Sequence, residues 1–92
     1  MILCIETSTT KCSAALGRGK EILASREAES PEGGHAAALA PMVDELLEVL
    51  RSHEGASLSA IAVSAGPGSY TGLRIGASLA KGLCLGYRVP LI

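Results

Sequence analysis

Aromatic residues are almost absent from this chain. It has no phenylalanine or tryptophan, and its tyrosines are Tyr70 and Tyr87. Hydrophobic residues nevertheless make up 48% of the 92 positions. The core must therefore be built from Ala, Leu, Ile and Val, with helices packed close to their neighbours. A chain of this length allows one domain, and a domain this small buries only about 60–65% of its unfolded surface.

Basic residues are few and scattered. Eight Lys and Arg stand against nine Asp and Glu, the formal net charge is −1, and Lys and Arg form no cluster. A nucleic-acid surface needs such a cluster, so we expect any contact with tRNA to be indirect, through a partner. The sequence also lacks a signal peptide and a run of about 18 apolar residues. We therefore expect a cytoplasmic protein with no membrane association.

The cysteines are too few and too far apart for a metal or redox motif. Cys4, Cys12 and Cys84 form no C-x-x-C pair and have no histidine at metal spacing. Each stands in an apolar stretch, which favours reduced, buried residues. His35 opens a predicted helix without a second ligand one turn away, which favours an exposed helix-start residue. No metal site is predicted.

Hydrophobic periodicity predicts a mixed α/β chain. The predicted elements, in chain order, are strands over 1–5, 12–16 and 21–28, a helix over 35–52, a strand over 60–64, a helix over 71–87 and a strand over 89–92. The first three strands form an antiparallel meander, because a polar turn and a glycine-containing hairpin join them. The order is therefore β-β-β-α-β-α-β.

Both predicted helices carry more apolar surface than one sheet contact requires. Beside the main apolar stripe of the first helix lies a second stripe of Ala38, Met42 and Val49. The polar residues of the second helix are only Arg74, Ser78 and Lys81, and its glycines and alanine at four-residue spacing are Gly72, Gly76 and Ala80, with Gly82 and Gly86 beyond them. Interior glycines cost about 1 kcal/mol each relative to alanine. Another backbone must approach this helix, and either the chain's own sheet or a partner helix could supply it.

Residues 66–76 read GPGSYTGLRIG and connect the fourth predicted strand to the second helix. Gly66 and Gly68 permit backbone angles closed to other residues, so the segment is predicted to form one tight loop. Ser69 and Thr71 stand where they can cap the helix, and free N–H groups there would suit a phosphate or carboxylate. The loop fits neither the Rossmann nor the Walker spacing. From the residues alone, two interpretations of this segment remain: a structural turn between strand and helix, or an anion-binding site.

The polar turn after the first strand reads ETSTT. It resembles the D-x-G-T-T phosphate loop of actin-like ATPases, with Thr7, Ser8 and Thr9 as candidate anion-binding residues. Two positions depart from that pattern: Glu6 replaces the aspartate that would hold magnesium-bound water, and Ser8 replaces a glycine that lets backbone approach phosphate. Two interpretations of this turn therefore remain: a polar structural turn or a degenerate nucleotide loop. Both are favoured over a working ATPase loop.

The loop at 66–76 also resembles the GPGS[FY]TG[LV]RIG signature of the bacterial TsaB (YeaZ) family. Residues 2–9 resemble the family's first strand and turn, and residues 35–47, with Pro41 inside, resemble its first helix, so the resemblance spans the chain. It implies a ribonuclease-H-like, actin-like (ASKHA) lobe. Residues 1–92 would then be a single amino-terminal lobe, truncated before a closing helix and a second lobe.

The resemblance implies a function as well. TsaB proteins are partners of the ligase TsaD, with the ATPase TsaE, in making threonylcarbamoyladenosine in tRNA. We therefore expect a scaffold subunit without catalytic residues that requires no cofactor, with ATP or ADP bound only in the full complex. The alternative is an actin-like-fold enzyme, either a TsaD-like threonylcarbamoyltransferase, which carries the M22 "glycoprotease" label, or a small-molecule kinase.

Two observations separate these alternatives. A peptidase would need a histidine pair, paired carboxylates or a nucleophile with a base at readable spacing, and the sequence shows none. The corresponding loop of the ligase family resembles G-P-G-L-x-G and has no arginine after it. This chain has Arg74 there, which favours the TsaB-like scaffold.

The apolar excess of the two helices predicts an interface with a TsaD-like partner or with a second copy of the chain. The resemblance points the same way. The predicted interface residues are Ala38, Met42, Val49, Leu73, Arg74, Gly76 and Ala77.

Overall fold

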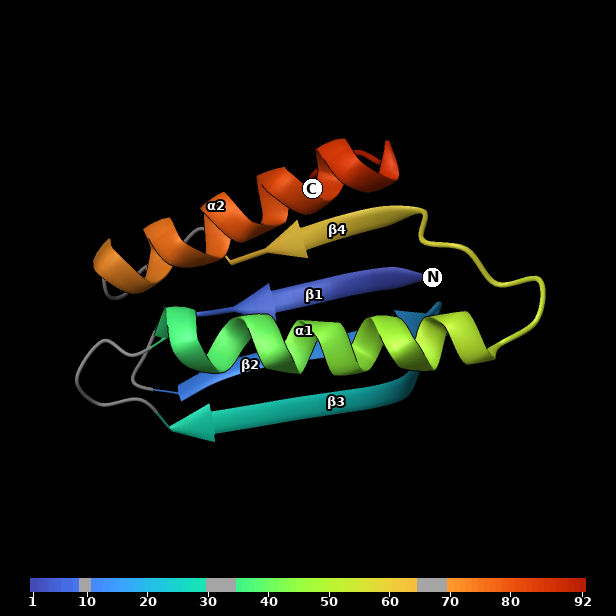
Figure 1. The fold of residues 1–92 in the computed structure, drawn as a ribbon, viewed down its shortest axis with the longest axis horizontal. Coiled ribbons are helices and arrows are strands. Elements are labelled where there is room, and N and C mark those ends of the chain that lie inside the picture. Colours follow the sequence, from blue (N-terminus) through green and yellow to red (C-terminus); the bar gives the residue numbers. More distant parts are fainter. Residues whose placement is uncertain (9–10, 30–34, 65–69) are drawn as a thin grey trace.

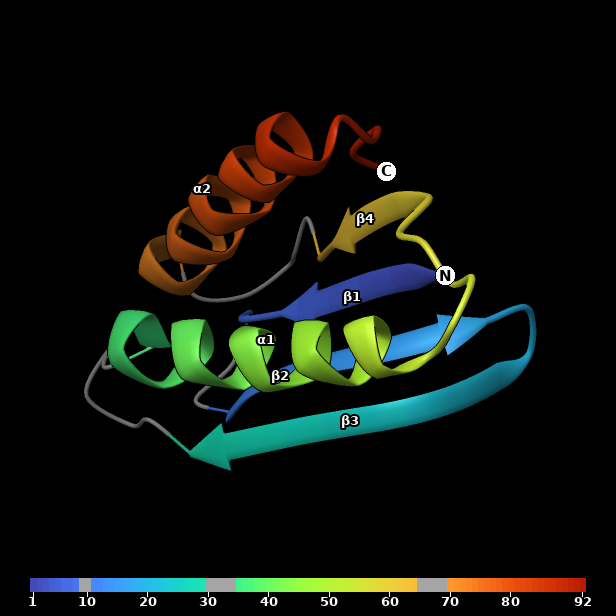
Figure 2. The ribbon, with the colours of Figure 1, turned by 45° about the vertical axis from the view of Figure 1, so that its right-hand side comes forward.

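The computed structural model describes residues 1–8, 11–29, 35–64 and 70–92. They form a four-stranded mixed sheet with two helices, and both helices lie on the same face of that sheet (Figures 1 and 2). The predicted α/β class is therefore confirmed.

The strands match the predicted ones to within two residues at each end. They are β1 (Ile2–Glu6), β2 (Lys11–Arg18), β3 (Glu21–Glu29) and β4 (Ala60–Val63). The sheet order is β3-β2-β1-β4, in which β2 is antiparallel to both β1 and β3, and β4 is parallel to β1. The predicted meander is thus present, and β4 joins it beside the first strand.

The hairpin between β2 and β3 is tighter than predicted, because β2 continues to Arg18. The turn contains Gly19 with φ of 60°, a left-handed angle that favours glycine. The strand pairing shifts register between Leu16 and Gly17, and a Cβ added at Gly17 would stand 2.8 Å from the Glu21 carbonyl oxygen. Gly17 therefore allows the bulge that aligns the hairpin.

The helices are α1 (His35–Ser52) and α2 (Tyr70–Tyr87). Helix α1 packs on β2 and β3, helix α2 packs on β4 and β1, and the two helices contact each other. Figures 1 and 2 show them side by side over the sheet. In the described part of the chain, neither helix is long and apolar enough to cross a membrane.

The core lies between the sheet and the helices, and it is aliphatic as predicted. Alternation along β1 buries Leu3 and Ile5 beneath the helices, and β2 buries alternate residues in the same way. The buried cluster consists of Leu3, Ile5, Cys12, Ala14, Leu16, Leu39, Met42, Val43, Leu46, Leu47, Leu50, Leu58, Ile61 and Ala80.

The opposite face of the sheet is left open by both helices. Cys4 of β1 faces this side, with Ala15 of β2 and Ala62 of β4 as its cross-strand neighbours. Glu6 follows two residues later on the same face, opposite Ser13. Around Cys4 and Glu6, small and polar side chains therefore cover this face.

The predicted last strand over 89–92 is present only as an isolated parallel bridge between Leu91 and Ile61. The Ile61 N–H donates to the Pro90 carbonyl oxygen at 3.0 Å, and the Ile92 N–H donates to the Ile61 carbonyl oxygen at 2.8 Å. These bonds place the segment along the free edge of β4.

The prediction that all three cysteines are buried is wrong for two of them. The three are free thiols, but Cys12 alone is buried, Cys84 is half-buried and Cys4 is exposed. Burial raises the pKa of the Cys12 thiol. Cys4 is exposed because β1 has helices over one of its two faces only.

Candidate functional site

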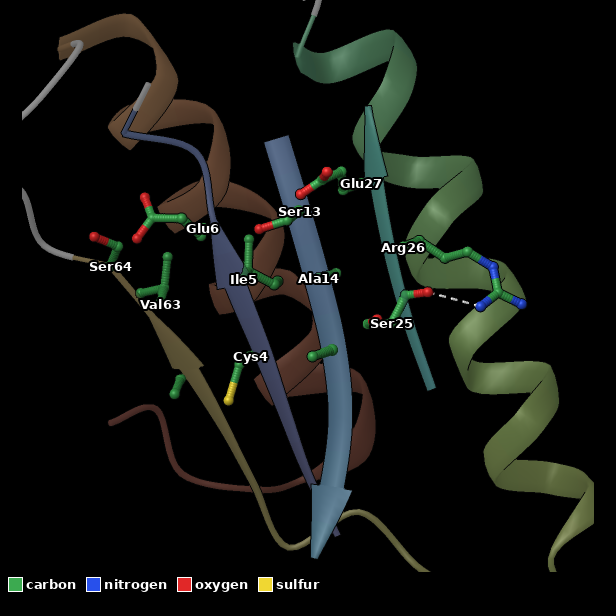
Figure 3. Close-up of a pocket in the computed structure, with 12 residues that line it drawn as sticks. Cys4, Ile5, Glu6, Ser13, Ala14, Ser25, Arg26, Glu27, Val63 and Ser64 are labelled. Atoms are coloured by element: carbon green, nitrogen blue, oxygen red, sulfur yellow. Dashed lines mark hydrogen bonds between the residues drawn. The ribbon is translucent and has the colours of Figure 1, made fainter. Parts of the chain in front are cut away.

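The turn that follows β1 lies at the edge of the sheet where β1 and β4 both end. The two strands are parallel, with Ile5 opposite Val63, so their carboxyl ends meet at one edge. The Ser64 N–H donates to the Ile5 carbonyl oxygen at 3.0 Å, which holds the residue after β4 beside β1. Figure 3 shows the Glu6 and Ser64 side chains next to one another there.

The Glu6 carboxylate organises this turn. Its Oε1 accepts hydrogen bonds from the Ser8 N–H, at 2.8 Å, and from the Ser8 hydroxyl. The Ser8 hydroxyl is the main cause that lowers the pKa of Glu6 below its ordinary value of 4.5; burial opposes the shift, and the Ser8 amide and Ser64 hydroxyl add to it. The carboxylate is therefore ionised at neutral pH and is held by uncharged donors.

Thr7, between these two residues, contacts helix α2. Its side chain is fully buried, and within the described residues its Oγ1 has no hydrogen-bond partner. A Cβ added at Gly76 would collide with Thr7 Oγ1 and would stand 3.4 Å from Val63 Cγ2. Gly76 therefore packs directly on the chain's own sheet. Of the two neighbours considered for the glycines of this helix, the chain's own sheet and a partner helix, the sheet accounts for Gly76.

Gly82 and Gly86 need a different explanation. Both are exposed, and within the described chain nothing lies within 4 Å of the position that a Cβ would take at either residue. Between them stands Leu85, whose side chain is 82% exposed. Packing on the chain's own sheet does not account for these two glycines, and the α2 backbone is bare on this side.

Most of the predicted interface residues lie at least partly at the surface. Ala38 and Val49 of α1 are half-buried and pack against the edge of the core. Leu73 and Ala77 of α2 are half-buried, and Arg74 is exposed. These residues come from two helices that lie side by side.

Met42 and Gly76 do not belong to that surface, and this part of the prediction is corrected. Met42 is 7% exposed and is part of the core, while Gly76 is buried against Thr7. Helix α1 contacts β2, β3 and α2, so it buries residues from both of its apolar stripes. A helix over a sheet alone would bury only one stripe.

Part of the predicted anion site lies outside the described residues, namely Thr9, Gly66, Gly68 and Ser69. Thr71 belongs to α2, but its side chain is also outside the described part. Of the remaining predicted residues, Ser8 is hydrogen-bonded to Glu6, and Thr7 packs on the helix side.

A shallow depression of about 850 Å³ lies on the open face of the sheet (Figure 3). Glu6 and Glu27 line it, together with the small side chains described above. Arg26 turns toward α1, where its Nε donates to Glu45 Oε2 at 3.0 Å. Among the described residues, no group of three or more His, Cys, Asp or Glu could hold a metal ion.

Two curated proteins similar to this chain share the name "tRNA threonylcarbamoyladenosine biosynthesis protein TsaB". The one from Escherichia coli K12 is 40% identical over 94 residues, which cover 99% of this chain and 38% of that protein. The one from Haemophilus influenzae Rd is 38% identical over 95 residues, which cover 99% of this chain and 37% of that protein. A solved structure of YeaZ from Pseudomonas aeruginosa superposes with a TM-score of 0.83 at 36% identity, covering 99% of this chain and 41% of that one.

A family model described as "TsaD: tRNA N6-adenosine threonylcarbamoyltransferase" matches residues 21–92. The chain belongs to this family, on its TsaB (YeaZ) branch. The resemblance seen at residues 66–76 is thereby confirmed. This TsaB-like chain spans less than two-fifths of the length of the two curated relatives.

Two surface features of the TsaB-like chain are missing from the sequence-based prediction. The first feature is the exposure of Leu85. At 100° per residue, Leu85 falls on the same side of α2 as Arg74 and Lys81, and this position among polar residues was the signal in the sequence that it is exposed. The open sheet face had a signal too, because small residues recur at alternate positions of β1 and β2, as at Cys4, Ser13 and Ala15.

Proposed function

We propose that this chain is the amino-terminal lobe of a non-catalytic TsaB-like subunit that supports a TsaD-like ligase in the threonylcarbamoyladenosine modification of tRNA. The observation that carries the proposal is the outer side of the two helices, where apolar side chains and bare glycine backbone remain accessible. The names of the relatives supply the process, because they describe those proteins as threonylcarbamoyladenosine biosynthesis proteins.

The accessible side of α2 has the features that a partner helix requires. Leu85 is 82% exposed, and burying a leucine side chain contributes about 1.5–3 kcal/mol. Gly82 and Gly86 flank it and would let another backbone approach closely. Leu73 and Ala77 lie nearer the start of the helix. A specific interface of about 800 Å² per partner is typical, and α2 with the half-buried residues of α1 can supply it.

The proposed fold is a ribonuclease-H-like, actin-like (ASKHA) lobe in the order β-β-β-α-β-α-β. The parallel addition of β4 to the meander supports it, and so does the bridge at Leu91, which would begin the last strand. Residues 1–92 would be one lobe of a longer protein that also has a closing helix and a second lobe. The likeness to YeaZ over less than half of that protein supports this division.

The remaining parts of the proposal concern partners and location. A TsaE-like ATPase would join the complex, a second copy of the chain could occupy the same helical surface, and the subunit would work in the cytoplasm. The net charge of −1 supports indirect contact with tRNA, held by another subunit. The chain itself would require no cofactor, and only the full complex could bind ATP or ADP.

A second function, that of a TsaD-like threonylcarbamoyltransferase, is favoured by one observation. The family model that matches residues 21–92 is described by that activity. The two functions differ in what the full-length protein does alone. A transferase would form threonylcarbamoyladenosine in tRNA without a TsaD-like subunit, whereas a scaffold would increase modification only when that subunit is present.

The scaffold function is tested by measuring binding of the full-length protein to the TsaD-like protein of the same organism by titration calorimetry. Leu85→Glu places a charge on the proposed surface without touching the core, because the side chain is 82% exposed. We expect the affinity to fall at least about tenfold, which corresponds to about 1.4 kcal/mol, with a matching loss of tRNA modification.

Ile22→Glu is the matched control. Ile22 is 69% exposed and lies on β3, away from the outer side of the helices. The same change in charge and size there should leave binding unaltered. Equal binding by the wild type and Leu85→Glu, with both proteins folded, would argue against this surface. Absence of binding by the wild type would argue against the scaffold function itself.

A further inference from the structure

The donors of Ser8, in the turn after β1, are already occupied by a side chain of the same turn. Ser8 offers its N–H and its hydroxyl, and both donate to the same carboxylate oxygen, Glu6 Oε1. The hydroxyl of Ser64, at the end of the neighbouring parallel strand, lies beside Glu6 and also lowers its pKa. Both Ser8 donors thus converge on one anionic group, with the Ser64 hydroxyl beside it.

We infer that the Glu6 carboxylate is an internal ligand of this turn, which takes the donors that an external oxyanion would need and so closes the turn to phosphate. This inference goes beyond the scaffold function, because it concerns what the strand-end turn excludes. The hydrogen-bond donors of Ser8 are satisfied by the Glu6 carboxylate, so they do not need a nucleotide phosphate as their acceptor.

Two physical effects keep an external phosphate out. The carboxylate is two residues from Ser8 in the chain, so it competes intramolecularly, and a free anion must overcome its high effective concentration. A phosphate placed beside Glu6 would also meet a like charge. Ser8 is itself only 8% exposed, so few approaches to its donors avoid Glu6.

The turn and the proposed partner surface are separate. Glu6 faces the open side of the sheet, whereas Leu85 lies on a helix that covers the opposite face. Failure of the internal-ligand inference would therefore leave partner binding untouched, and loss of partner binding would leave the turn unchanged.

The test uses the full-length protein labelled with nitrogen-15 and titrated with inorganic phosphate, with pyrophosphate as a second probe. The Ser8 amide resonance reports directly on the turn. In the wild type we expect this resonance to stay in place. In Glu6→Ala we expect it to shift with saturation, at an affinity at least about tenfold tighter than that of the wild type.

Glu27→Ala is the matched control, because it removes a carboxylate from the same open face without touching Ser8. It should behave like the wild type. If Glu27→Ala gains phosphate binding equal to that of Glu6→Ala, the effect is one of net charge and the inference fails. It also fails if the wild type binds phosphate as tightly as Glu6→Ala, or if folded Glu6→Ala binds none.

A second measurement decides the question if Glu6→Ala does not fold. The side-chain carboxyl carbon of Glu6 is followed by NMR during a pH titration of the wild type, Ser8→Ala and Ser13→Ala. Ser13 lies opposite Glu6 on β2, whereas Ser8 donates to it. We expect Ser8→Ala alone to raise the pKa of Glu6. Identical titrations in all three proteins would overturn the internal-ligand inference.

Discussion

The buried hydroxyl of Thr7 lies against the backbone of Gly76, at the point where the end of β1 meets helix α2. No side chain larger than hydrogen fits at Gly76 without moving Thr7. Within the described residues the hydroxyl has no hydrogen-bond partner. This contact brings the helix close to the sheet at this point, and it can be tested by substitution of either residue.

Substitution of Gly76 should destabilise the protein. Overpacking a tight site typically costs about 1–3 kcal/mol, which exceeds the gain of about 1 kcal/mol in helix propensity on replacing glycine by alanine. We expect Gly76→Ala to lower the melting temperature and Gly76→Leu to lower it further. Gly82→Ala is the control, since open space surrounds that position, and it should raise the melting temperature. The same sign for both alanine variants would contradict the packing described here.

Replacing Thr7 by valine should stabilise the protein. The change keeps the branched shape and removes a buried hydroxyl that lacks a partner, whose desolvation costs about 1–3 kcal/mol. Urea unfolding of Thr7→Val should therefore give a free energy of unfolding about 1 kcal/mol higher than that of the wild type. Thr7→Ser, which keeps the hydroxyl and loses the methyl group, should be less stable. A destabilised valine variant would mean that the hydroxyl is hydrogen-bonded in solution.

The Glu6 carboxylate should make stability depend on acid pH. Folding lowers the pKa of Glu6 below 4.5, chiefly through the Ser8 hydroxyl, so its contribution is present above that value and is lost as the pH falls through the folded pKa. Glu6→Gln should be less stable than the wild type at pH 7, and the difference should shrink toward pH 3. Chemical unfolding over this range measures it, with Glu27→Gln as control. A constant difference would contradict the assignment.

The exposed Leu85 and the bare backbone at Gly82 and Gly86 of α2 should also support self-association of the full-length protein. Sedimentation velocity at increasing concentration should show a dimer, and Leu85→Glu should shift it toward monomer without changing the far-ultraviolet circular dichroism. Ile22→Glu should sediment like the wild type. A wild-type protein that remains monomeric at high concentration would exclude the second copy as an occupant and leave the TsaD-like partner.

The sequence was sufficient to predict the elements because periodicity reports local burial. The order of three strands, a helix, a strand and a helix follows from it, and so does the aliphatic core. The surroundings of individual helix residues could not be predicted in this way. Gly76 and Gly82 are alike in sequence terms, yet one packs on Thr7 and the other faces open space, because spacing does not reveal where the sheet lies around the helix.

Burial of Met42 and exposure of Cys4 have a related physical cause. The two stripes of α1 can be seen in the sequence, but only the three-dimensional arrangement shows that α2 stands beside α1, so that the sheet and α2 together bury residues of both stripes. Cys4 sits in a central strand, which a sequence pattern presents as buried on both faces. In the described chain both helices gather on one face, so the opposite side chains stay accessible.

The position of β1 between β2 and β4 has a consequence for how the molecule assembles. Its pairing with β2 closes a short loop. Its pairing with β4 joins two strands that are separated in the chain by β3 and α1 as well as β2, so this pairing must wait until those elements are compact. Loop closure costs more entropy for longer loops, and distant pairings form slowly. The meander can therefore form first, and β4 with α2 completes the sheet last. The helix that presents Leu85 would then be the last to dock and the first to open.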